Sequence, residues 1–247
     1  MKKFITNFDT TAELAIFSAT TDFGKPHVSL TEDDSKVHYF EDDPYNGHEY
    51  VEIGGLKWAT MNIGASKPSD CGLYFAWGDT QGYTAEQVGS GEGKKYFGWA
   101  DYKYGNGTSE PGEKGMAKYN STDRLTKLEP SDDAAVANWG GSWRMPTTDD
   151  FQALGAAVNT AWTKVNGAYG ILCTDKTDSS KTLFFPAAGY CSDGGVIYVD
   201  GDGDYWSSSL STDDRQNAYN LYFVSYSDNW GFSNYRYCGY AVRPVVG

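Results

Sequence analysis

The C-terminal segment from Tyr205 to Gly247 combines many aromatic side chains with small polar ones, mostly serine, asparagine, aspartate and glycine. A buried core would be richer in leucine, isoleucine and valine, whereas a disordered tail would contain few aromatic residues. Tyrosine, serine and asparagine on a rigid frame are typical of antibody paratopes. The end of an ordinary tyrosine-rich β-domain has a similar composition, so composition alone leaves both interpretations open. The aromatic residues of the segment are Tyr205, Trp206, Tyr219, Tyr222, Phe223, Tyr226, Trp230, Phe232, Tyr235, Tyr237 and Tyr240.

The whole chain is acidic and long enough for one sizeable core. It has 247 residues and a formal net charge of -13. A nucleic acid or an anionic membrane would require a basic stripe, so we expect neither as a partner. No apolar run approaches the ~20 residues that span a bilayer. The sequence starts with two lysines, but Asp9 and Glu13 interrupt any apolar run that follows. We therefore expect no signal peptide and no export through the Sec pathway.

Residues 1–46 form a predicted small N-terminal unit for docking or attachment, and residues 47–247 the main domain. In the first unit, Thr10 to Glu13 fits a capping box before a short helix. Residues 27–30 and 36–40 flank a polar loop, which is a hairpin pattern. Residues 41–47 contain acidic residues, proline and glycine, which indicate a linker. So small a unit buries little core by itself, and we expect it to dock on a larger body or on copies of itself.

The main domain shows short strand patterns and two helix patterns, which predict the α+β class. One helix is expected over 131–139 with Ser131 as N-cap, and a second after Pro146 with Thr147 as N-cap. Residues 78–118 show no clear period and are interpreted as a long irregular surface loop. The expected strands are 50–53, 56–58, 72–77, 170–173, 183–185, 195–199, 205–208, 218–223 and 240–243.

Few residues point to catalysis or to a metal. None of the three histidines lies beyond residue 48, which removes Ser-His-Asp and Cys-His catalysis from the main domain. The four cysteines, Cys71, Cys173, Cys191 and Cys238, are far apart and are expected to be buried free thiols. Residues 89–93 are glycine-rich but lack the spacing of a phosphate-binding loop. Carboxylate pairs for glycoside hydrolysis stay open, because acidic residues are abundant and nothing singles out a pair.

Three aspartates alternate with glycine at Asp200, Asp202 and Asp204. They resemble the first half of a calcium-binding loop. A complete loop of that kind has glycine at its sixth position and glutamate at its twelfth, where this sequence has Tyr205 and Ser211. We favour a tight acidic turn, with calcium binding left open, and we expect no cofactor.

Four motifs then occur in a characteristic order, at residues 139–147, 184–189, 205–209 and 239–244 (WGGSWRMPT, FFPAAG, YWSSS and GYAVRP). In this order they resemble the C-type-lectin-fold domains related to formylglycine-generating enzymes. More closely, they resemble the variable proteins of diversity-generating retroelements, found in phages and bacteria. The resemblance covers roughly residues 49–247 and implies a C-type-lectin fold with two main helices and long irregular loops.

In that family an error-prone reverse transcriptase rewrites adenines near the 3′ end of the gene, so that asparagine codons become codons for other residues. The resemblance implies a variable region over about 205–247. Its fixed frame is implied to contain Asn217, Ala218, Tyr219, Leu221, Phe223, Ser225, Trp230, Arg236 and Gly239, and we also assign Trp206 and Arg243 to the frame. The candidate ligand-binding positions are Tyr222, Val224, Tyr226, Asp228, Asn229, Gly231, Phe232, Ser233, Asn234, Tyr235, Tyr237 and Cys238.

The alternation along the chain agrees with this division. Leu221 and Phe223 alternate with Tyr222 and Val224, so one set faces the core of a strand and the other faces outward. A set selected for packing would favour leucine and isoleucine. The outward set instead mixes tyrosine, valine, serine, aspartate and glycine, as expected of a surface that tolerates substitution.

The resemblance implies a non-enzymatic binding protein whose ligand is a protein or glycan on a cell surface. Residues 1–46 also resemble the leading segments of such proteins in phages, which implies attachment to the virion tail after assembly in the host cytoplasm. Analogy with virion fibres makes a homotrimer the oligomeric state to test. The alternatives left open are an oxidase of the formylglycine-generating type, a calcium-dependent sugar-binding lectin, and a structural fibre domain without a ligand.

Overall fold

The computed structural model describes residues 43–109 and 111–247. The chain divides into two units between Asp43 and Pro44. The helix and hairpin expected within residues 1–40 lie outside the described residues. Everything below concerns the second unit.

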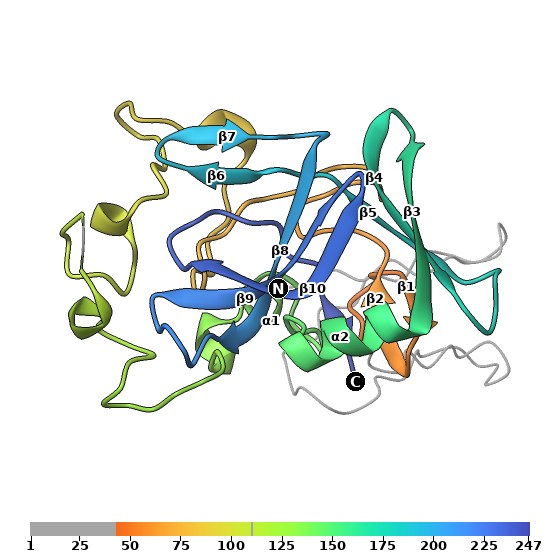
Figure 1. Ribbon diagram of the computed structural model, residues 1–247, viewed down its shortest axis with the longest axis horizontal. Helices are drawn as coiled ribbons and strands as arrows, with labels where there is room; N and C mark the ends of the chain where they lie inside the picture. The colour runs from red at the N-terminus through yellow and green to blue at the C-terminus, as the bar shows by residue number, and fades with distance from the viewer. Residues whose placement is uncertain (1–42, 110) are drawn as a thin grey trace, which may run out of the picture. The chain divides into compact units, whose positions relative to one another are not determined.

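The second unit is α+β, with antiparallel sheets as its main component (Figure 1). One sheet has the order β1-β2-β11 and consists of β1 (Tyr50–Ile53), β2 (Leu56–Ala59) and β11 (Val245–Val246). A second has the order β3-β4-β5, with β3 at Val158–Val165, β4 at Ala168–Asp175 and β5 at Thr182–Pro186. The third has the order β10-β9-β8, with β8 at Asp202–Leu210, β9 at Asn217–Val224 and β10 at Ser227–Tyr235. Strands β6 (Tyr190–Ser192) and β7 (Gly195–Ile197) pair with each other.

The helices begin where the sequence offers caps. Helix α2 (Thr148–Ala157) starts at Thr147, whose hydroxyl accepts a hydrogen bond from the Asp150 backbone, as predicted. Helix α1 (Ala134–Trp139) starts two residues later than expected. Its N-cap is Asp133, which accepts from the backbone N–H groups of Ala135 and Val136, and not Ser131. Ser131 lies instead in the 3-10 turn η5 (Pro130–Asp132).

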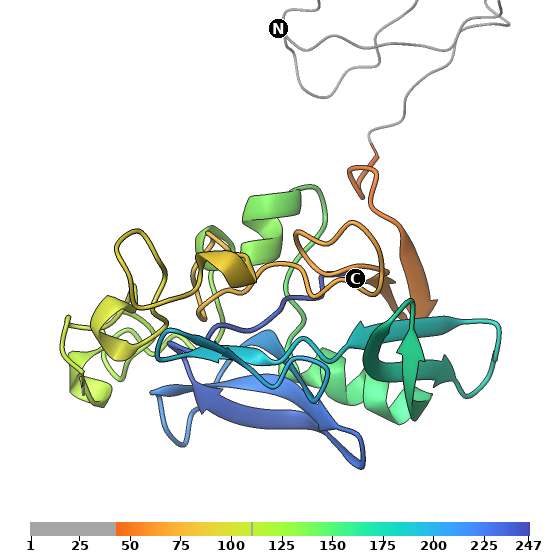
Figure 2. The same ribbon diagram turned by 90° about the horizontal axis from the view of Figure 1, so that it is seen from above.

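The core lies between α2 and the sheets, and aromatic residues dominate it. Phe151 of α2 stacks on Trp58 of β2 with a centroid distance of 5.6 Å, and both side chains are buried. Helix α2 packs against β8, β9 and β10 as well. Figure 2 shows the β9–β10 hairpin at one edge of the unit, with the rest of the unit on its other side. Strand β10 therefore lies at the surface of the unit, whereas both faces of β8 are largely buried.

Two arginines, Arg236 and Arg243, are fully buried, and neither forms an ion pair with an acidic side chain of the residues that the structure describes. The Arg243 guanidinium donates to Asn62 Oδ1 and to the carbonyl oxygens of Ala59, Thr60 and Phe184. Burial lowers the pKa of Arg243 to about 10. These hydrogen bonds compensate for the loss of water around the guanidinium, which an unpaired buried charge would otherwise make costly. Arg243 thus joins the end of the chain to β2 and β5, in agreement with its assignment to the frame.

Residues 78–118 are irregular, as predicted, but they do more than cover the surface. They contain the 3-10 turns η2 (Ala85–Gln87), η3 (Trp99–Asp101) and η4 (Glu113–Gly115). Several of their aromatic side chains, including Phe97, Tyr102 and Tyr104, are buried in the core. The interpretation as a surface loop was therefore incomplete.

Some strands differ from expectation. Residues 72–77 and 240–243 were predicted as strands but form only isolated bridges, such as Phe75 with Tyr240, although Tyr74 to Trp77 are buried as expected. The final strand is β11, after Arg243. Strands β3, β6 and β10 were not predicted. The hairpin of β1 and β2 and the strands β4, β5, β7, β8 and β9 were located correctly.

The predicted linker is partly ordered against the second unit. The His48 ring stacks on Trp139 with a centroid distance of 3.7 Å. The Trp143 indole donates to the Tyr45 carbonyl, and the Ser142 N–H donates to the Pro44 carbonyl. Residues 44–48 therefore belong to the second unit, because these aromatic and backbone contacts hold them there.

Candidate ligand-binding face

The β10-β9-β8 sheet positions most of the candidate residues. Side chains along a strand point alternately to its two faces. Leu221 and Phe223 are fully buried, whereas Tyr222 and Val224 are half-buried, which confirms the predicted alternation on β9. Opposite Tyr222 the register places Asp204 on β8 and Asn229 on β10.

We call the side of the sheet that carries Tyr222 the ligand face. The strand register and the side-chain contacts assign to it Asp202 and Asp204 on β8, Asn220, Tyr222 and Val224 on β9, and Asn229, Phe232 and Asn234 on β10.

The candidate residues differ in exposure. Tyr226, in the turn between β9 and β10, is the most exposed of the candidate aromatic residues, at 89%. Exposed side chains are also found at Asp228, Asn229, Phe232 and Tyr235, and half-buried ones at Tyr222, Val224, Gly231, Ser233, Asn234 and Tyr237. Cys238 is 4% exposed, so the expectation that it faces outward was wrong. It follows the turn after β10, where its N–H donates to the Tyr235 carbonyl. In the other direction, Ser225 was assigned to the frame but is exposed in the β9–β10 turn.

The exposed rings form two clusters. In the first, Tyr222 and Phe232 face each other across β9 and β10 with a centroid distance of 5.3 Å. In the second, Tyr235 and Tyr237 stack at 5.6 Å, and Trp99 contacts them at 5.7 Å and 4.8 Å. Aromatic pairs of this kind prefer offset or edge-to-face geometry, which fixes the rings without burying them.

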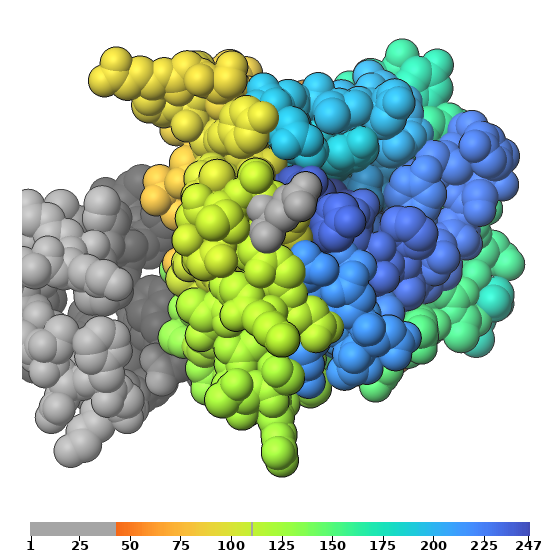
Figure 3. All heavy atoms as spheres, turned by 60° about the vertical axis from the view of Figure 1, so that its left-hand side comes forward, coloured from red at the N-terminus to blue at the C-terminus, as the bar shows by residue number. Residues whose placement is uncertain are grey.

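Sequence reasoning missed the contribution of residues outside the C-terminal segment. Trp99 lies in η3, more than a hundred residues away from Tyr235 in sequence. Tyr190 and Tyr198 flank β6 and β7, with a ring distance of 6.2 Å, and Tyr198 is 62% exposed. No local pattern announces these contacts, because they depend on how the long loop and the β6–β7 hairpin pack. Figure 3 shows the blue C-terminal segment at the surface between the yellow-green loop and the cyan hairpin.

A bulge in β10 divides the candidate residues between the two faces. The register between β10 and β9 shifts between Asn229 and Phe232. Just before it, Asp228 turns toward β3, because its carboxylate accepts hydrogen bonds from the Thr160 hydroxyl and the Trp230 indole. The half-buried Trp230 packs on Gly155 of α2, in agreement with its assignment to the frame. The bulge thus restores Phe232 to the ligand face after Trp230 has turned inward.

Two aspartates of β8 belong to the ligand face, the half-buried Asp202 and the buried Asp204. The Asp204 carboxylate is 3% exposed and accepts a hydrogen bond of 3.0 Å from the Asn220 amide. Burial, together with the charge of Asp202, raises the pKa of Asp204 well above its ordinary value. Burial and then the charges of Asp202 and Asp204 raise the pKa of Tyr222. The register agrees with these shifts, because it places Asp204 opposite Tyr222 and Asp202 opposite Val224.

The three alternating aspartates do not converge. Asp200 lies in a turn at a positive φ of 64°, and its carboxylate accepts from the Tyr169 N–H, while Asp202 and Asp204 belong to β8. Among the described residues there is no group of three acidic, histidine or cysteine side chains arranged to hold a metal ion. The geometry is that of an acidic turn leading into a strand.

The four cysteines are free thiols, as predicted. Cys173, Cys191 and Cys238 are buried, whereas Cys71 is only half-buried. The backbone of Cys191 pairs with Gly239, which brings Cys191 and Cys238 into neighbouring positions. Burial raises the pKa of Cys238 to about 12 and also raises that of Cys191. Both shifts disfavour the thiolate, which is the form that binds metals and attacks electrophiles.

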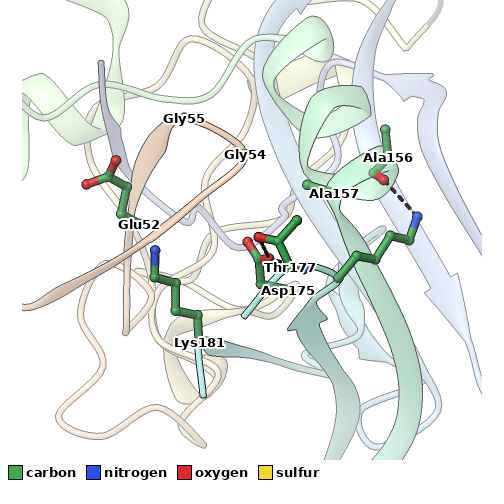
Figure 4. Close-up of a pocket in the computed structure, with 9 residues that line it drawn as sticks. Glu52, Gly54, Gly55, Ala156, Ala157, Asp175, Thr177 and Lys181 are labelled. Atoms are coloured by element: carbon green, nitrogen blue, oxygen red, sulfur yellow. Dashed lines mark hydrogen bonds between the residues drawn. The ribbon is translucent and has the colours of Figure 1, made fainter. Parts of the chain in front are cut away.

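A separate hollow of about 440 Å³ lies elsewhere in the unit, between the β1–β2 turn, the end of α2 and the β4–β5 loop (Figure 4). Inside it, the Lys176 ammonium donates to the Ala156 carbonyl at the end of α2, and the Asp175 carboxylate accepts from Thr177. These groups therefore already have partners within the protein. None of the candidate ligand-binding residues lines this hollow.

Comparisons of the chain with models of protein families, with curated proteins and with solved structures found no match. Within residues 43–109 and 111–247, no helix has the length and apolar character needed to cross a membrane.

Proposed function

We propose that the second unit is a non-enzymatic binding domain with a C-type-lectin fold, which displays residues of β9, β10 and the turns beside them to a macromolecular ligand. The observation that carries the proposal is the exposure of aromatic rings on β9, on β10 and in the segments next to them, above a packed core. Tyr222, Tyr226, Phe232, Tyr235 and Tyr237 are all exposed or half-buried. Exposed aromatic clusters rimmed by polar groups are characteristic of interaction surfaces.

The resemblance to the variable proteins of diversity-generating retroelements extends this proposal. Substitution at the exposed positions would change the ligand while Leu221, Phe223, Arg236 and Arg243 keep the frame. The ligand would be a protein or glycan on a cell surface. Attachment to a phage virion through residues 1–46, assembly in the host cytoplasm and a homotrimeric state are parts of the same proposal.

The first test asks whether the exposed rings serve ligand binding or are needed for the packing of the fold. We expect alanine at Tyr222, Tyr226, Phe232, Tyr235 and Tyr237 to lower the free energy of unfolding by about 1 kcal/mol or less at each position. The matched control is alanine at a buried aromatic on the same strands, Tyr205 or Phe223, for which about 3–5 kcal/mol is expected. Urea denaturation followed by circular dichroism measures both. Loss of the fold in the exposed set would contradict the proposal.

A second test is genetic. Sequencing around the gene is expected to show a reverse transcriptase gene and a template repeat that matches the codons for residues 205–247. Their absence would leave a structural fibre domain, without diversification, as the better interpretation.

An oxidase of the formylglycine-generating type is the alternative function with a specific observation in its favour. Cys191 and Cys238 occupy neighbouring positions, and such enzymes use a cysteine pair with copper. The raised pKa values of both thiols and the burial of Cys238 weigh against it. Copper titration together with measurements of thiol accessibility distinguishes the two functions.

A further inference from the structure

The part of the chain that forms the ligand face provides almost no positive charge at its surface. From Thr182 to Gly247 the sequence contains no lysine, and its arginines are Arg215, Arg236 and Arg243. Arg236 and Arg243 are fully buried and bonded to carbonyl oxygens. Arg215 is half-buried and donates to the Leu125 carbonyl.

The acidic groups of the same part of the chain lie beside the exposed rings. Asp202 and Asp204 neighbour Tyr222, whose phenol pKa they raise in addition to the effect of burial. Asp200 is exposed in the turn before them, and Asp202 donates its N–H to the Tyr198 carbonyl. None of the ion pairs formed by the described residues includes Asp200, Asp202 or Asp204.

The rings and the aspartates form one continuous surface. Tyr198 contacts Tyr190, and the bridge between Gly189 and Gly203 sets Tyr190 beside β8. Asp204 of β8 lies opposite Tyr222, which contacts Phe232. Beneath them, the Oδ1 atom of Asn220 is buried and has no hydrogen-bond partner within the described residues, while its amide group binds Asp204. A buried acceptor without a donor is costly, and a donor supplied from outside would remove that cost.

We propose that the ligand face, together with the adjoining Tyr190 and the turn at residues 198–200, binds a positively charged segment of a protein. Lysine or arginine side chains would lie over Tyr198, Tyr190 and Tyr222, with their charged groups directed to Asp202 and to the exposed Asp200, whose carboxylate also accepts from the Tyr169 N–H. This inference rests on the proposed binding function and specifies the class of partner. Aromatic faces attract cations, and neighbouring carboxylates add charge complementarity. Anionic surface polymers are repelled by the same carboxylates.

An ammonium or guanidinium group fits this face better than a quaternary ammonium headgroup does. A quaternary ammonium has no N–H donors, whereas lysine has three and arginine five. The carboxylates of Asp200 and Asp202 and the Asn220 Oδ1 atom are all acceptors. A neutral glycan has no positive charge that could pair with these carboxylates.

The test uses the full-length protein and three probes at millimolar concentration. The probes are a short peptide of alternating lysine, serine and glycine, the same peptide with glutamate in place of lysine, and a neutral oligosaccharide. Amide chemical shifts measured by NMR report both the affinity and the location. We expect the lysine peptide to shift the amides of residues 198–204 and 222–232, to bind at least about tenfold more tightly than the other probes, and to weaken as salt is added.

Matched variants distinguish the effect of the carboxylates at this surface from the effect of the net charge of the protein. Asp200→Asn combined with Asp202→Asn is expected to weaken binding of the lysine peptide by about threefold or more, whereas Glu52→Gln combined with Asp178→Asn changes net charge equally and is expected to have little effect. Tyr198→Ser, at an exposed ring, is expected to weaken it by about twofold to threefold.

Several outcomes would overturn the inference. These are equal binding of the glutamate peptide or the oligosaccharide, equal effects of the two charge variants, and the absence of shifts with the lysine peptide. The proposed function has a separate test, because selection of binders from a library randomised at the exposed positions does not depend on the charge of the target. Binders obtained against neutral targets only would leave the binding function in place and remove the cationic partner.

Discussion

Asp204 is the residue whose ionisation the fold opposes most clearly. Its carboxylate is 3% exposed, Asp202 lies nearby, and the Asn220 amide is the hydrogen-bond donor that reaches it. Burial without a cation penalises the charged form and raises the pKa. A raised pKa in the folded state has a consequence for stability, because the folded protein binds this proton more tightly than the unfolded chain does.

The direction in which stability changes with pH follows from proton binding in the folded and unfolded states. Below pH 3.8, the ordinary value for aspartate, both states hold the proton. As the pH rises above it, the unfolded chain loses the proton first, so the contribution of Asp204 to the free energy of unfolding falls with increasing pH. Asp204→Asn keeps an acceptor for Asn220 and removes this loss. We therefore expect the stability of the variant relative to the natural protein to increase between about pH 4 and 7, by about 1.4 kcal/mol for each unit by which the pKa is raised.

Urea denaturation of both proteins across this pH range measures the difference. Asp178→Asn, at an exposed carboxylate whose pKa is lowered by the Ser180 hydroxyl and backbone, is the control. It is expected to show no such increase. A difference between Asp204→Asn and the natural protein that stays constant or falls with pH would show that Asp204 is ionised in the folded state.

At the scale of elements, the contact between α2 and β10 decides where the ligand face lies. Gly155 of α2 lies against the Trp230 ring, and a Cβ at this position would be 2.7 Å from the ring atoms. The absence of a side chain at Gly155 is therefore what lets Trp230 turn inward. The bulge that follows then returns Phe232 to the outer side.

Gly155→Ala tests this contact. Alanine is favoured in a helix interior by about 1 kcal/mol over glycine. The clash with Trp230 is expected to outweigh that gain and to destabilise the protein by about 1–3 kcal/mol. The control, Ala156→Gly at an exposed position of the same helix, costs only the helix propensity, about 1 kcal/mol. Urea denaturation measures both, and the NMR amide shifts of residues 227–235 report the displacement of β10. A stabilising effect of Gly155→Ala would show that Trp230 repacks freely.

Local signals predicted α2 well, because its cap and its apolar spacing all lie within the helix. The strand β10 could not be predicted in this way. Its serine, aspartate, asparagine and glycine residues have low strand propensity, and it forms because the turn at residues 225–226 folds it back onto β9. Residues 72–77 show the converse, since their apolar run indicated burial correctly but did not determine pairing.

The sequence predicted those parts of the candidate site that depend on local structure alone. Alternation on β9 identified Tyr222 and Val224, because it depends only on strand geometry. The burial of Cys238 and the contact of the half-buried Trp99 with Tyr235 and Tyr237 could not be predicted, because both are set by segments far away in sequence. The clusters of rings are therefore a property of the fold, although the residue types that form them are visible in the sequence.

At the scale of the whole molecule, the division between Asp43 and Pro44 implies that the second unit folds without the first. We expect a chain that begins at Pro44 to unfold at the same urea concentration as the full-length protein. A chain that begins at Glu49 loses the stacking of His48 on Trp139 and the contacts of Pro44 and Tyr45. It is expected to be less stable by about 1 kcal/mol or more. Equal loss of stability in both shortened chains would show that the first 43 residues support the fold.

Arg236 lies between Tyr235 and Tyr237 in the chain, yet no part of it reaches the solvent. Its guanidinium donates to the carbonyl oxygens of Lys118 and Arg215 and to the Tyr102 hydroxyl, and it lies over the Trp77 ring. The buried Arg236 side chain thus connects its own backbone segment with those at Lys118 and Arg215, and the three segments do not belong to one sheet. Substitutions at both neighbouring tyrosines would leave these hydrogen bonds in place, so they are expected to change the surface without displacing the backbone that supports it.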